Sequence, residues 1–290
     1  MDNEGIYTVE KMCRVLGVSR TGYYRWKERM KYPNLEKQMF KEELCGKITK
    51  SFYESLCTYG SPRVYRDLLD WGYEISLKTV ARYMHEMSLR AIPTEKFVVT
   101  TDSNHDRPVY PNLVNRKFNI SKPNRVWVAD ITYIWTLEGW LYLASVMDLY
   151  SRKIVGWALD SHMRKDLPLQ ALNNALNSRN VTKKLVHHSD RGSQYCSNDY
   201  VDILVDNKIN ISMSRKGDPY DNACIESFHA TIKKELIYRT RFVSRADGRK
   251  AVANYIVSFY NERRRHSTIG YFSPNNYERK YRLLETQKIS

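Results

Sequence analysis

The sequence predicts an α/β protein, with a mixed five-stranded sheet flanked by helices and preceded by small all-α segments. Residues 1–90 carry apolar side chains at helical spacing, whereas from residue 125 the pattern changes to short β-branched and aromatic runs. Three such runs follow one another directly, and later runs alternate with helical segments. A meander that leads into alternating strands and helices implies a mixed sheet with helices on its faces.

A helix, a tight turn and a second helix are predicted within residues 8–27. Gly17 interrupts the apolar pattern, and Ser19 can cap a second helix that carries two tyrosines and a tryptophan. This outline is typical of a helix-turn-helix motif, which commonly binds DNA.

Residues 61–87 predict a second helical pair. Pro62 stands near the start of its first helix, and Ser76 can cap its second. The apolar stripe of that second helix leaves Lys78 and Arg82 pointing outward, so we expect both to contact DNA. Helix-turn-helix outlines also arise by chance, and the alternative is a pair of hairpins that only pack.

A proline-containing interval separates these helices from the strands. Four prolines stand between residues 93 and 123 in a stretch with little periodicity, which indicates a linker. We expect a helix-turn-helix-like segment at 1–44, a helix-turn-helix-like domain at 45–92, a linker at 93–119, and a catalytic domain with a basic helical C-terminal part at 120–285.

The second half of the chain predicts eight elements in the order β-β-β-α-β-α-β-α. Asp221 or Asn222 can cap the last helix, whose apolar residues recur at three- and four-residue steps. In chain order we expect strands at 125–136, 140–150 and 153–161, a helix at 166–179, a strand at 183–190, a helix at 197–207, a strand at 209–214 and a helix at 221–236.

Composition excludes several classes of protein. With 42% hydrophobic and 12% aromatic residues the chain can bury a sizeable core, which argues against disorder. No apolar run approaches a membrane span, and the acidic start does not resemble a signal peptide, so we expect a soluble cytoplasmic protein. The five cysteines are widely spaced without a C-x-x-C pair, so we expect reduced packing residues.

The positive charge is concentrated at one end of the chain. The formal net charge is +15, and residues 227–290 contribute 14 Lys and Arg against 5 Asp and Glu. Tyrosines are interspersed through this basic segment. Cations that displace condensed counterions and aromatic rings that stack are typical of nucleic-acid contact.

Three carboxylates occupy distinctive places in the predicted order. Asp130 lies within the first strand, Asp190 ends the fourth, and Glu226 lies on the last predicted helix, with Lys233 two turns further on the same side. A carboxylate in an apolar strand is costly unless its charge is compensated, and a divalent metal would compensate it. Mg²⁺ favours two or three carboxylates with open coordination positions, and a metal pair suits phosphoryl transfer.

Other polar residues have simpler expected roles. Adjacent strand residues point to opposite faces, so at most one of His187 and His188 can face the carboxylates, and we expect structural roles for both. Asp148 is a candidate fourth acid, with turn formation or an ion pair to Arg152 as the favoured reading. Asp218 and Asp221 are typical turn and cap residues.

The motifs together resemble a known family. WVADITYI, YLASVMDLYSRKIVGWAL, HHSDRGSQYCS, SRKGDPYDNACIESFHATIKKEL and YNERRRHSTIGYFSP are similar to the catalytic subunit, OrfB, of bacterial insertion sequences that encode a DDE transposase in two overlapping reading frames. The 35 residues between Asp190 and Glu226 match the D, D, 35, E spacing of the retroviral integrase superfamily. LGVSRTGYYRW and GSPRVYRDLL resemble the N-terminal part of that subunit, so the resemblance covers nearly the whole chain.

The resemblance implies a fold, a reaction and a set of functional residues. The fold is a ribonuclease H-like integrase core that brings the first and fourth strands side by side. Asp130, Asp190 and Glu226 match the catalytic, metal-binding triad for two Mg²⁺ or Mn²⁺ ions, and Lys233 matches a contact to the transposon-end DNA. In the RRRH run we expect Arg264 and His266 to contact phosphate, with a solvated charged run as the alternative.

The predicted activity is DNA transposition: cleavage at the ends of an insertion sequence and transfer of the 3′-hydroxyl into target DNA. Because two ends must meet, we expect at least a homodimer, and the resemblance implies a fusion to, or complex with, the product of an upstream reading frame. A bacterial transposase would be nucleoid-associated. The alternatives are a ribonuclease H-like nuclease that only hydrolyses and a DNA-binding regulator derived from a transposase.

Overall fold

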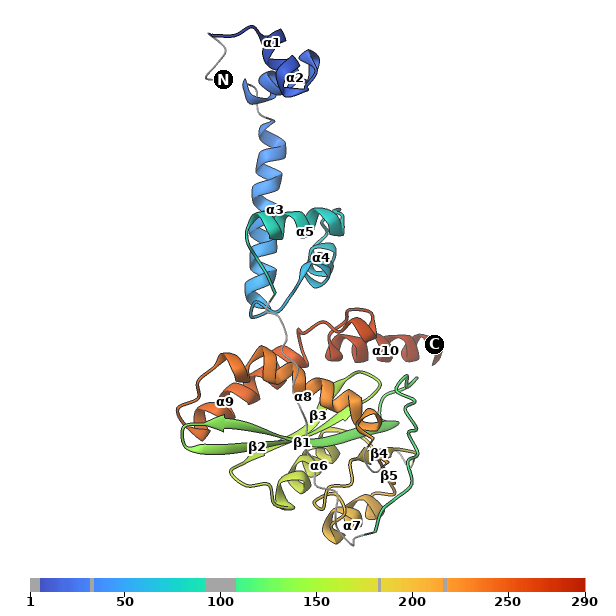
Figure 1. The fold of residues 1–290 in the computed structure, drawn as a ribbon. Helices are drawn as coiled ribbons and strands as arrows, with labels where there is room; N and C mark the ends of the chain where they lie inside the picture. The colour runs from blue at the N-terminus through green and yellow to red at the C-terminus, as the bar shows by residue number, and fades with distance from the viewer. Residues whose placement is uncertain (1–5, 32–33, 92–107, 182–183, 216–217, 290) are drawn as a thin grey trace. The chain divides into compact units, whose positions relative to one another are not determined.

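The computed structural model describes residues 6–31, 34–91, 108–181, 184–215 and 218–289 (Figure 1). The chain divides into two compact units, a helical unit (residues 1–54 and 59–90) and a catalytic unit (residues 55–58 and 91–290). Most of the predicted linker, residues 93–107, lies outside the described residues. No helix in the described part of the chain has the length and apolar character needed to cross a membrane.

The helical unit contains both predicted helical pairs and one long helix between them. Gly17 ends the first helix with a left-handed backbone (φ 64°), and the Ser76 side chain caps the last helix by accepting from the Thr79 amide. Leu44, Ile48 and Leu68 are fully buried where the later helices pack. The helices are α1 (Val9–Leu16), α2 (Arg20–Lys31), α3 (Leu35–Glu54), α4 (Ser61–Asp70) and α5 (Leu77–Glu86).

The helix α3 has no counterpart in the sequence-based prediction, and it extends through the predicted boundary at residues 44 and 45. Its apolar residues are spread around the helix rather than gathered in one stripe, which hid it from a search for periodicity. Ser51 on α3 donates to Asp67 on α4 at 2.6 Å, so a buried polar contact fixes this helix to the second pair.

The catalytic unit contains the predicted β-β-β-α-β-α-β-α order, and that prediction is confirmed. Its sheet has the strand order β3-β2-β1-β4-β5, with antiparallel β1–β2 and β2–β3 pairs and parallel β1–β4 and β4–β5 pairs. The elements are β1 (Val126–Thr136), β2 (Gly139–Asp148), β3 (Lys153–Asp160), α6 (Asp166–Ser178), β4 (Val186–Ser189), α7 (Asn198–Asp206), β5 (Asn210–Met213) and α8 (Ala223–Glu235).

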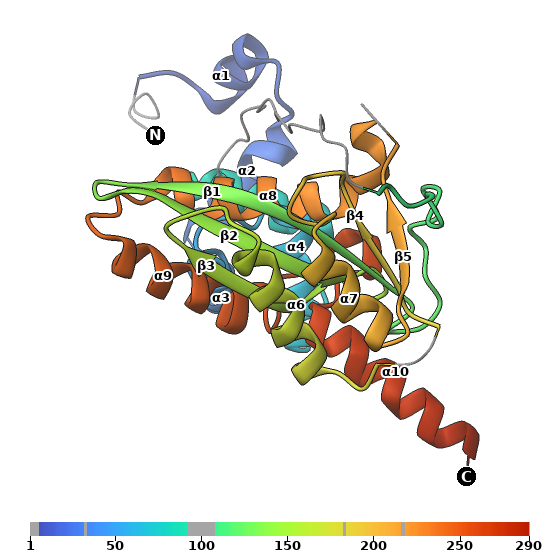
Figure 2. The same cartoon turned by 90° about the horizontal axis from the view of Figure 1, so that it is seen from below.

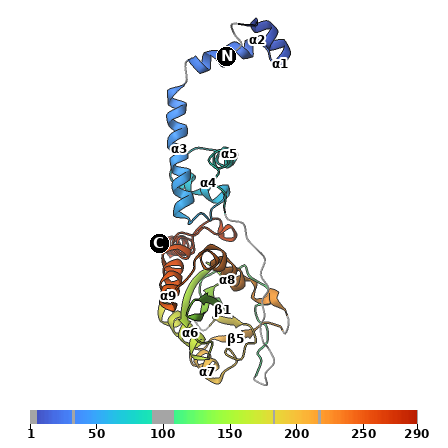
Figure 3. The same ribbon diagram turned by 60° about the vertical axis from the view of Figure 1, so that its left-hand side comes forward.

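Two helical layers cover the sheet (Figure 3). The helices α6 and α7 lie on one face, where Trp127, Ala129, Ala144 and Leu172 are among the residues of a buried apolar core. On the other face lie α8 and α9 (Arg245–Asn254). The strands β1 and β2 extend as a two-stranded hairpin beyond the other strands, because β4 pairs only as far as Ala129 and β3 pairs with β2 only from Tyr142 (Figure 2).

Gly156 allows α6 to approach β3 closely. A Cβ at this position would lie 2.3 Å from the Ala171 carbonyl oxygen and 2.5 Å from the Ala175 amide nitrogen. Both neighbours are helix backbone, which cannot move away without shifting the helix. Glycine is therefore required by the spacing between the two elements.

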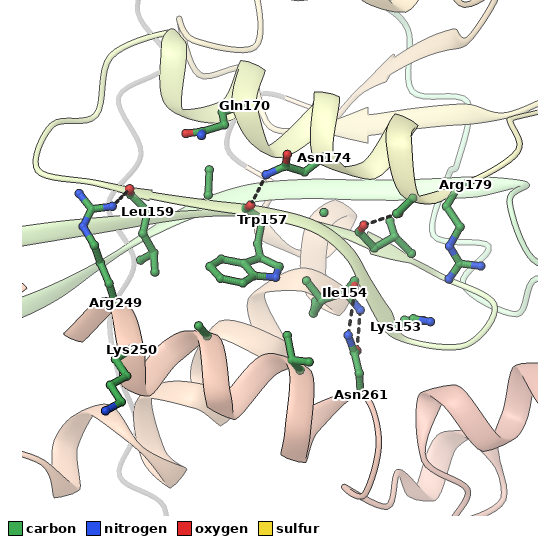
Figure 4. A pocket seen from close by; sticks show the side chains of 16 residues that line it. Lys153, Ile154, Trp157, Leu159, Gln170, Asn174, Arg179, Arg249, Lys250 and Asn261 are labelled. Carbon is green, nitrogen blue, oxygen red and sulfur yellow. Dashed lines mark hydrogen bonds between the residues drawn. The ribbon is translucent and has the colours of Figure 1, made fainter. Parts of the chain in front are cut away.

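Side chains cover the outer edge of β3, which is an edge strand. A hollow of about 740 Å³ lies between β3, α6 and the α9 segment (Figure 4). Four polar side chains satisfy backbone groups along it. Asn174 donates to the Trp157 carbonyl (2.9 Å), Ser178 to the Val155 carbonyl (2.8 Å) and Arg249 to the Leu159 carbonyl. Asn261 pairs with both the N–H (3.0 Å) and the carbonyl (2.9 Å) of Ile154. Covered carbonyl groups make this edge a poor template for pairing with another strand.

The basic C-terminal part is helical, as predicted. The helix α9 continues into a π-helical turn (Tyr255–Tyr260), and α10 (Pro274–Ile289) ends the described chain. Glu278 on α10 is 2% exposed and accepts from Ser151 and from Arg179, each at 2.7 Å. These contacts attach α10 to the start of β3 and the end of α6.

We predict that Gly156→Ala lowers the free energy of unfolding by about 1–3 kcal/mol, the range for an overpacked core. Gly46→Ala is the control, because the added Cβ meets nothing within 4 Å and alanine favours a helix interior by about 1 kcal/mol. Urea unfolding followed by tryptophan fluorescence and circular dichroism measures both. Equal midpoints for Gly156→Ala and the natural protein would contradict the close approach of α6 to β3.

Candidate active site

Two aspartates meet where the parallel pair β1–β4 ends. The last paired residues of these strands are Ala129 on β1 and Ser189 on β4. Asp130 and Asp190 follow them directly, so both aspartates lie at the same edge of the sheet. The backbone turns directly after β4, and the Asp190 side chain accepts through Oδ1 from the Gly192 amide at 2.9 Å. The predicted side-by-side placement of the first and fourth strands is confirmed.

Glu226 completes an acidic cluster from a third element. It lies in the first turn of α8, and the helix is fixed by Ile225, Phe228 and Ile232, which are each no more than 2% exposed. Burial, with added repulsion from Asp130 and Asp190, raises the pKa of Glu226 from 4.5 to about 7. The half-buried carboxyl of Glu226 therefore lies within electrostatic range of both aspartates.

His229 links two strands at this cluster. Its Nδ1 lies 3.2 Å from Asp130 Oδ2, and its Nε2 lies 2.7 Å from the Ser145 hydroxyl. Ser145 is the register partner of Asp130 on β2, and both His229 and Ser145 are buried. The second oxygen of Asp130 accepts from the Ile131 amide at 2.8 Å.

Lys233 lies beside the same cluster. Its ammonium stands 4.2 Å from the centre of the Tyr133 ring, a cation–π contact. Burial lowers the pKa of Lys233, while the negative charge of Asp130 acts in the opposite direction. The lysine is therefore within electrostatic range of the acids, as expected for a group that contacts a phosphate bound there.

Among the described residues, no group of three His, Cys, Asp or Glu side chains is drawn together into a ready-made metal cage. The candidate metal ligands form an open set. Asp130 and Asp190 stand at adjacent strand ends, and their charges contribute to the raised pKa of the third carboxylate, Glu226. Mg²⁺ keeps several waters and binds through few carboxylates, so it suits an open set of this kind better than a closed cage. The residues present therefore fit a hydrated divalent cation.

The two adjacent histidines are structural, as expected. His187 is buried, with Nε2 3.0 Å from the Tyr200 hydroxyl, and burial lowers its pKa to about 3. His188 points to the other side, its Nδ1 lies 2.8 Å from the Ser212 hydroxyl, and burial lowers its pKa to about 4. Neutral, hydrogen-bonded rings on both faces of β4 stabilise the strand that ends at Asp190.

Two further acids are structural, and for Asp148 the structure confirms turn formation, one of its two expected roles. Asp148 is fully buried, accepts from the amides of Asn124 and Tyr150, and has its pKa raised to about 6 by burial, so it forms the turn without an ion pair to Arg152. Asn222 occupies the predicted N-cap position of α8, but its side chain makes no cap hydrogen bond and its side-chain amide donates to the Ala129 carbonyl instead. Asp221 is fully buried in ion pairs with Arg215 and Arg116, which hold its pKa well below the usual range.

Of the two predicted phosphate contacts in the RRRH run, Arg264 is buried and His266 is half-buried. Arg264 is 6% exposed and forms a bidentate ion pair with Glu235. Its guanidinium therefore stabilises the end of α8, and the structure does not favour it as a DNA contact. The half-buried His266 ring packs on Tyr260 with centroids 4.9 Å apart, which also favours a packing role.

The helical unit presents the predicted cations to solvent. Lys78 and Arg82 are exposed on α5, one turn apart. Arg82 lies 3.7 Å from Glu86 and over the Tyr83 ring. Exposed pairs of this kind contribute little to stability, so both side chains remain available to a polyanion.

His229 and Ser145 were not recognised from the sequence, although a signal for them existed. The predicted turn at Glu138 and Gly139 fixes the hairpin register, which pairs Thr136 with Gly139 and therefore Asp130 with Ser145. The position of His229, three residues after Glu226, then places a polar side chain on the buried side of α8.

Comparison with known proteins agrees with this geometry. Two models described as "Integrase core domain" match residues 120–219 and 207–274, and an "HTH-like domain" model matches residues 40–97. The transposase InsF of insertion sequence IS3A from Escherichia coli K12 is 41% identical over 94% of this chain and 95% of its own length. The chain belongs to the insertion-sequence transposases with an integrase core.

Other relatives agree with this family. A 31 kDa protein of insertion element IS600 from Shigella sonnei is 43% identical to this transposase over 94% of the chain and 99% of its own length. Among solved structures, the catalytic core domain of HTLV-2 integrase in complex with magnesium covers 50% of this chain and 91% of that core, at 16% identity and a TM-score of 0.38. The family match confirms the predicted integrase catalytic core and the enzyme class, the polynucleotidyl transferases.

We predict that the ionisation of Glu226 destabilises the metal-free transposase as the pH rises from about 4.5 to 7. The folded-state pKa of Glu226 is raised, so its contribution is present below the unfolded value of 4.5 and is lost as the pH rises through about 7. Glu226→Gln removes this dependence, and the variant should be more stable than the natural protein at pH 8 in chelator and similar to it at pH 4.5.

Thermal unfolding at both pH values tests the prediction, because groups shared by the two proteins cancel in the difference. Asp202→Asn, at an exposed acid on α7, is the control that should leave the pH dependence unchanged. A difference between Glu226→Gln and the natural protein that does not vary with pH would contradict the repulsion among the three acids.

Proposed function

We propose that Asp130, Asp190 and Glu226 form the active site of a transposase that cleaves DNA at the ends of an insertion sequence and joins the resulting 3′-hydroxyl to target DNA. The observation that carries this proposal is the convergence of three acids from β1, β4 and α8, where burial first and the charges of Asp130 and Asp190 second raise the pKa of Glu226. The named activity of the relatives at 41% identity supports it.

The three acids would hold Mg²⁺ or Mn²⁺, and we propose two ions as the number bound. When bound, the metal activates the attacking oxygen and stabilises the leaving oxygen of an in-line phosphoryl transfer. The protein positions the acids on rigid elements, and Lys233 supplies a fixed positive charge beside them. Both steps transfer a phosphoryl group directly between oxygens, so no protein nucleophile is required.

The DNA end would lie along Lys233 and the β1–β2 hairpin. Among the strands that the structure describes, none pairs with β1 beyond Ala129 on the side of β4, which leaves the site open at this edge. The hairpin exposes an aromatic cluster in which Trp135 and Trp140 have ring centroids 4.8 Å apart, and Tyr133 packs on Trp140 at 5.2 Å. Exposed rings beside a lysine suit base stacking next to a bound phosphate.

The helical unit would bind DNA through α5, with Lys78 and Arg82 on phosphates. Joining two ends requires at least two active sites, so we propose a homodimer or higher oligomer on DNA. An upstream reading-frame product, fused or bound, would add further end recognition, and a nucleoid location follows from DNA binding. The segment boundaries at residues 44, 92 and 119 also remain predictions.

Two other functions make different predictions. A ribonuclease H-like nuclease would hydrolyse DNA without joining strands. A DNA-binding regulator would bind the terminal repeats without metal-dependent activity. The open acidic cluster favours the transposase over the regulator, because a regulator has no use for three mutually repelling carboxylates.

Incubation of the purified chain with labelled DNA that carries its flanking terminal repeats tests the proposal directly. We expect Mg²⁺-dependent cleavage at the repeat boundary, followed by strand-joined products. Asp130→Asn and Glu226→Gln should each lower the rate by at least about 10³-fold, while Asp202→Asn should not. Cleavage that persists in Glu226→Gln would contradict the assignment, and hydrolysis without joining would favour the nuclease.

We predict that Lys78→Ala with Arg82→Ala weakens binding to end DNA and reduces the slope of log affinity against log salt by about 1.8, since each phosphate contact contributes about 0.9. Fluorescence anisotropy at several salt concentrations measures the slope. Lys250→Ala, at an exposed lysine on α9, is the matched control. An unchanged slope in the double variant would remove α5 from DNA binding.

We predict that Trp135→Ala raises the dissociation constant for end DNA with unpaired terminal bases by about 5–150-fold, since stacking on one ring contributes about 1–3 kcal/mol. Fully paired internal DNA should bind the variant and the natural protein equally. Trp71→Ala, at a similarly exposed tryptophan of the helical unit, is the control. Equal loss on both kinds of DNA would argue against base stacking at the hairpin.

A further inference from the structure

His229 occupies a junction between the acidic cluster and the sheet. It is 5% exposed, and each ring nitrogen lies within hydrogen-bond distance of one partner, Nδ1 with Asp130 and Nε2 with Ser145. Those partners come from neighbouring strands and face each other in the hairpin register. One side chain on α8 therefore connects β1 and β2 at the point where Asp130 enters the site.

We propose that His229 is a positioning residue that holds the Asp130 carboxylate in its metal-binding orientation, with Ser145 fixing the direction of the imidazole hydrogen bonds. This inference rests on the proposed function, because it assigns His229 a role toward the metal that Asp130 would bind. It differs from a simple packing role, since the ring contacts a ligand oxygen directly.

The hydrogen-bonding capacities of the three groups determine which nitrogen carries the proton. An ionised carboxylate only accepts, so the arrangement assigns the hydrogen to Nδ1, which lies 3.2 Å from Asp130 Oδ2. In the neutral ring Nε2 then accepts, and the Ser145 hydroxyl donates to it at 2.7 Å. A neutral His229 satisfies both contacts at once.

The same three residue types form the catalytic triad of serine hydrolases, but that function is excluded here. In a hydrolase the serine hydroxyl must reach the substrate. Ser145 lies within β2 and is 1% exposed, so a substrate carbonyl cannot approach it. The arrangement instead directs the hydrogen bonds toward Asp130, which is the only member at the open edge of the sheet.

Two consequences for the site follow from this contact. The Ile131 amide holds Asp130 Oδ1 and His229 holds Oδ2, so both oxygens are oriented while each keeps a lone pair for a cation. His229 is also three residues from Glu226 on the same helix, so the contact sets the position of α8, and with it Glu226, relative to Asp130. Hydrogen bonds of this kind to metal ligands contribute about 10–100-fold in metal affinity.

Two substitutions separate positioning from packing. His229→Phe fills the ring volume but loses both hydrogen bonds. His229→Asn leaves a cavity, but its side-chain amide lies near the position of Nδ1 and can donate to Asp130. A packing role predicts that Phe is tolerated better than Asn, whereas a positioning role predicts the reverse for metal binding.

The experiment measures Mn²⁺ binding to the full chain without DNA, from the electron paramagnetic resonance signal of free Mn²⁺, together with thermal unfolding in chelator. We expect His229→Phe to weaken Mn²⁺ affinity by about 10–100-fold relative to the natural protein. His229→Asn should bind Mn²⁺ nearly as tightly as the natural protein, and Ser145→Ala should lose less Mn²⁺ affinity than His229→Phe. In chelator, His229→Phe should be at least as stable as His229→Asn, so the orders of stability and affinity should be opposite.

The outcomes separate this proposal from the proposed function. Natural affinity in His229→Phe, or affinities that follow the order of stability, would overturn the positioning role while leaving the metal site intact. Equal Mn²⁺ binding by the natural protein and Asp130→Asn would overturn the metal site itself, and the role of His229 with it.

Discussion

Repulsion among Asp130, Asp190 and Glu226 is the constraint on which the arrangement of the catalytic unit depends. Three carboxylates at one edge of a sheet oppose folding, and burial, with added repulsion from Asp130 and Asp190, raises the pKa of Glu226 to about 7. A protein keeps such a cluster only if the surrounding structure holds it in place. The register of β1 and β4 and the buried side of α8 provide this support.

Buried hydrogen bonds and ion pairs support the elements that carry the acids. Around β4, the neutral His187 and His188 are hydrogen-bonded on both faces of the strand. At the end of α8, Arg264 and Glu235 form a buried bidentate pair. In the sequence His187 and His188 look like metal ligands and Arg264 looks like a DNA contact. In the structure all three stabilise the strand and the helix that carry the acids.

Much of this site could be predicted because its signals are local. An aspartate in an apolar strand, an aspartate at a strand end and a glutamate on an amphipathic helix are each visible from neighbouring residues alone. The strand order of the sheet is not local, and it came from the family resemblance rather than from the pattern. The contact of His229 needed both the hairpin register and the side of α8 that faces the sheet, so no single motif revealed it.

The errors have a common physical cause. Arg264 and Asp221 look like surface residues because charged side chains are seldom buried alone. Each is buried with partners that its own position in the sequence does not identify, Arg264 with Glu235, and Asp221 with Arg215 and Arg116. Burial of paired charges depends on tertiary contacts that composition cannot show.

The account depends on a divalent cation at the meeting point of β1, β4 and α8. A crystal structure of the chain with Mn²⁺, with anomalous scattering used to locate the metal, tests this most directly. We expect anomalous density within coordination distance of Asp130 and Asp190, with Glu226 turned toward it. Density at another site, or none at concentrations that support cleavage, would contradict the account.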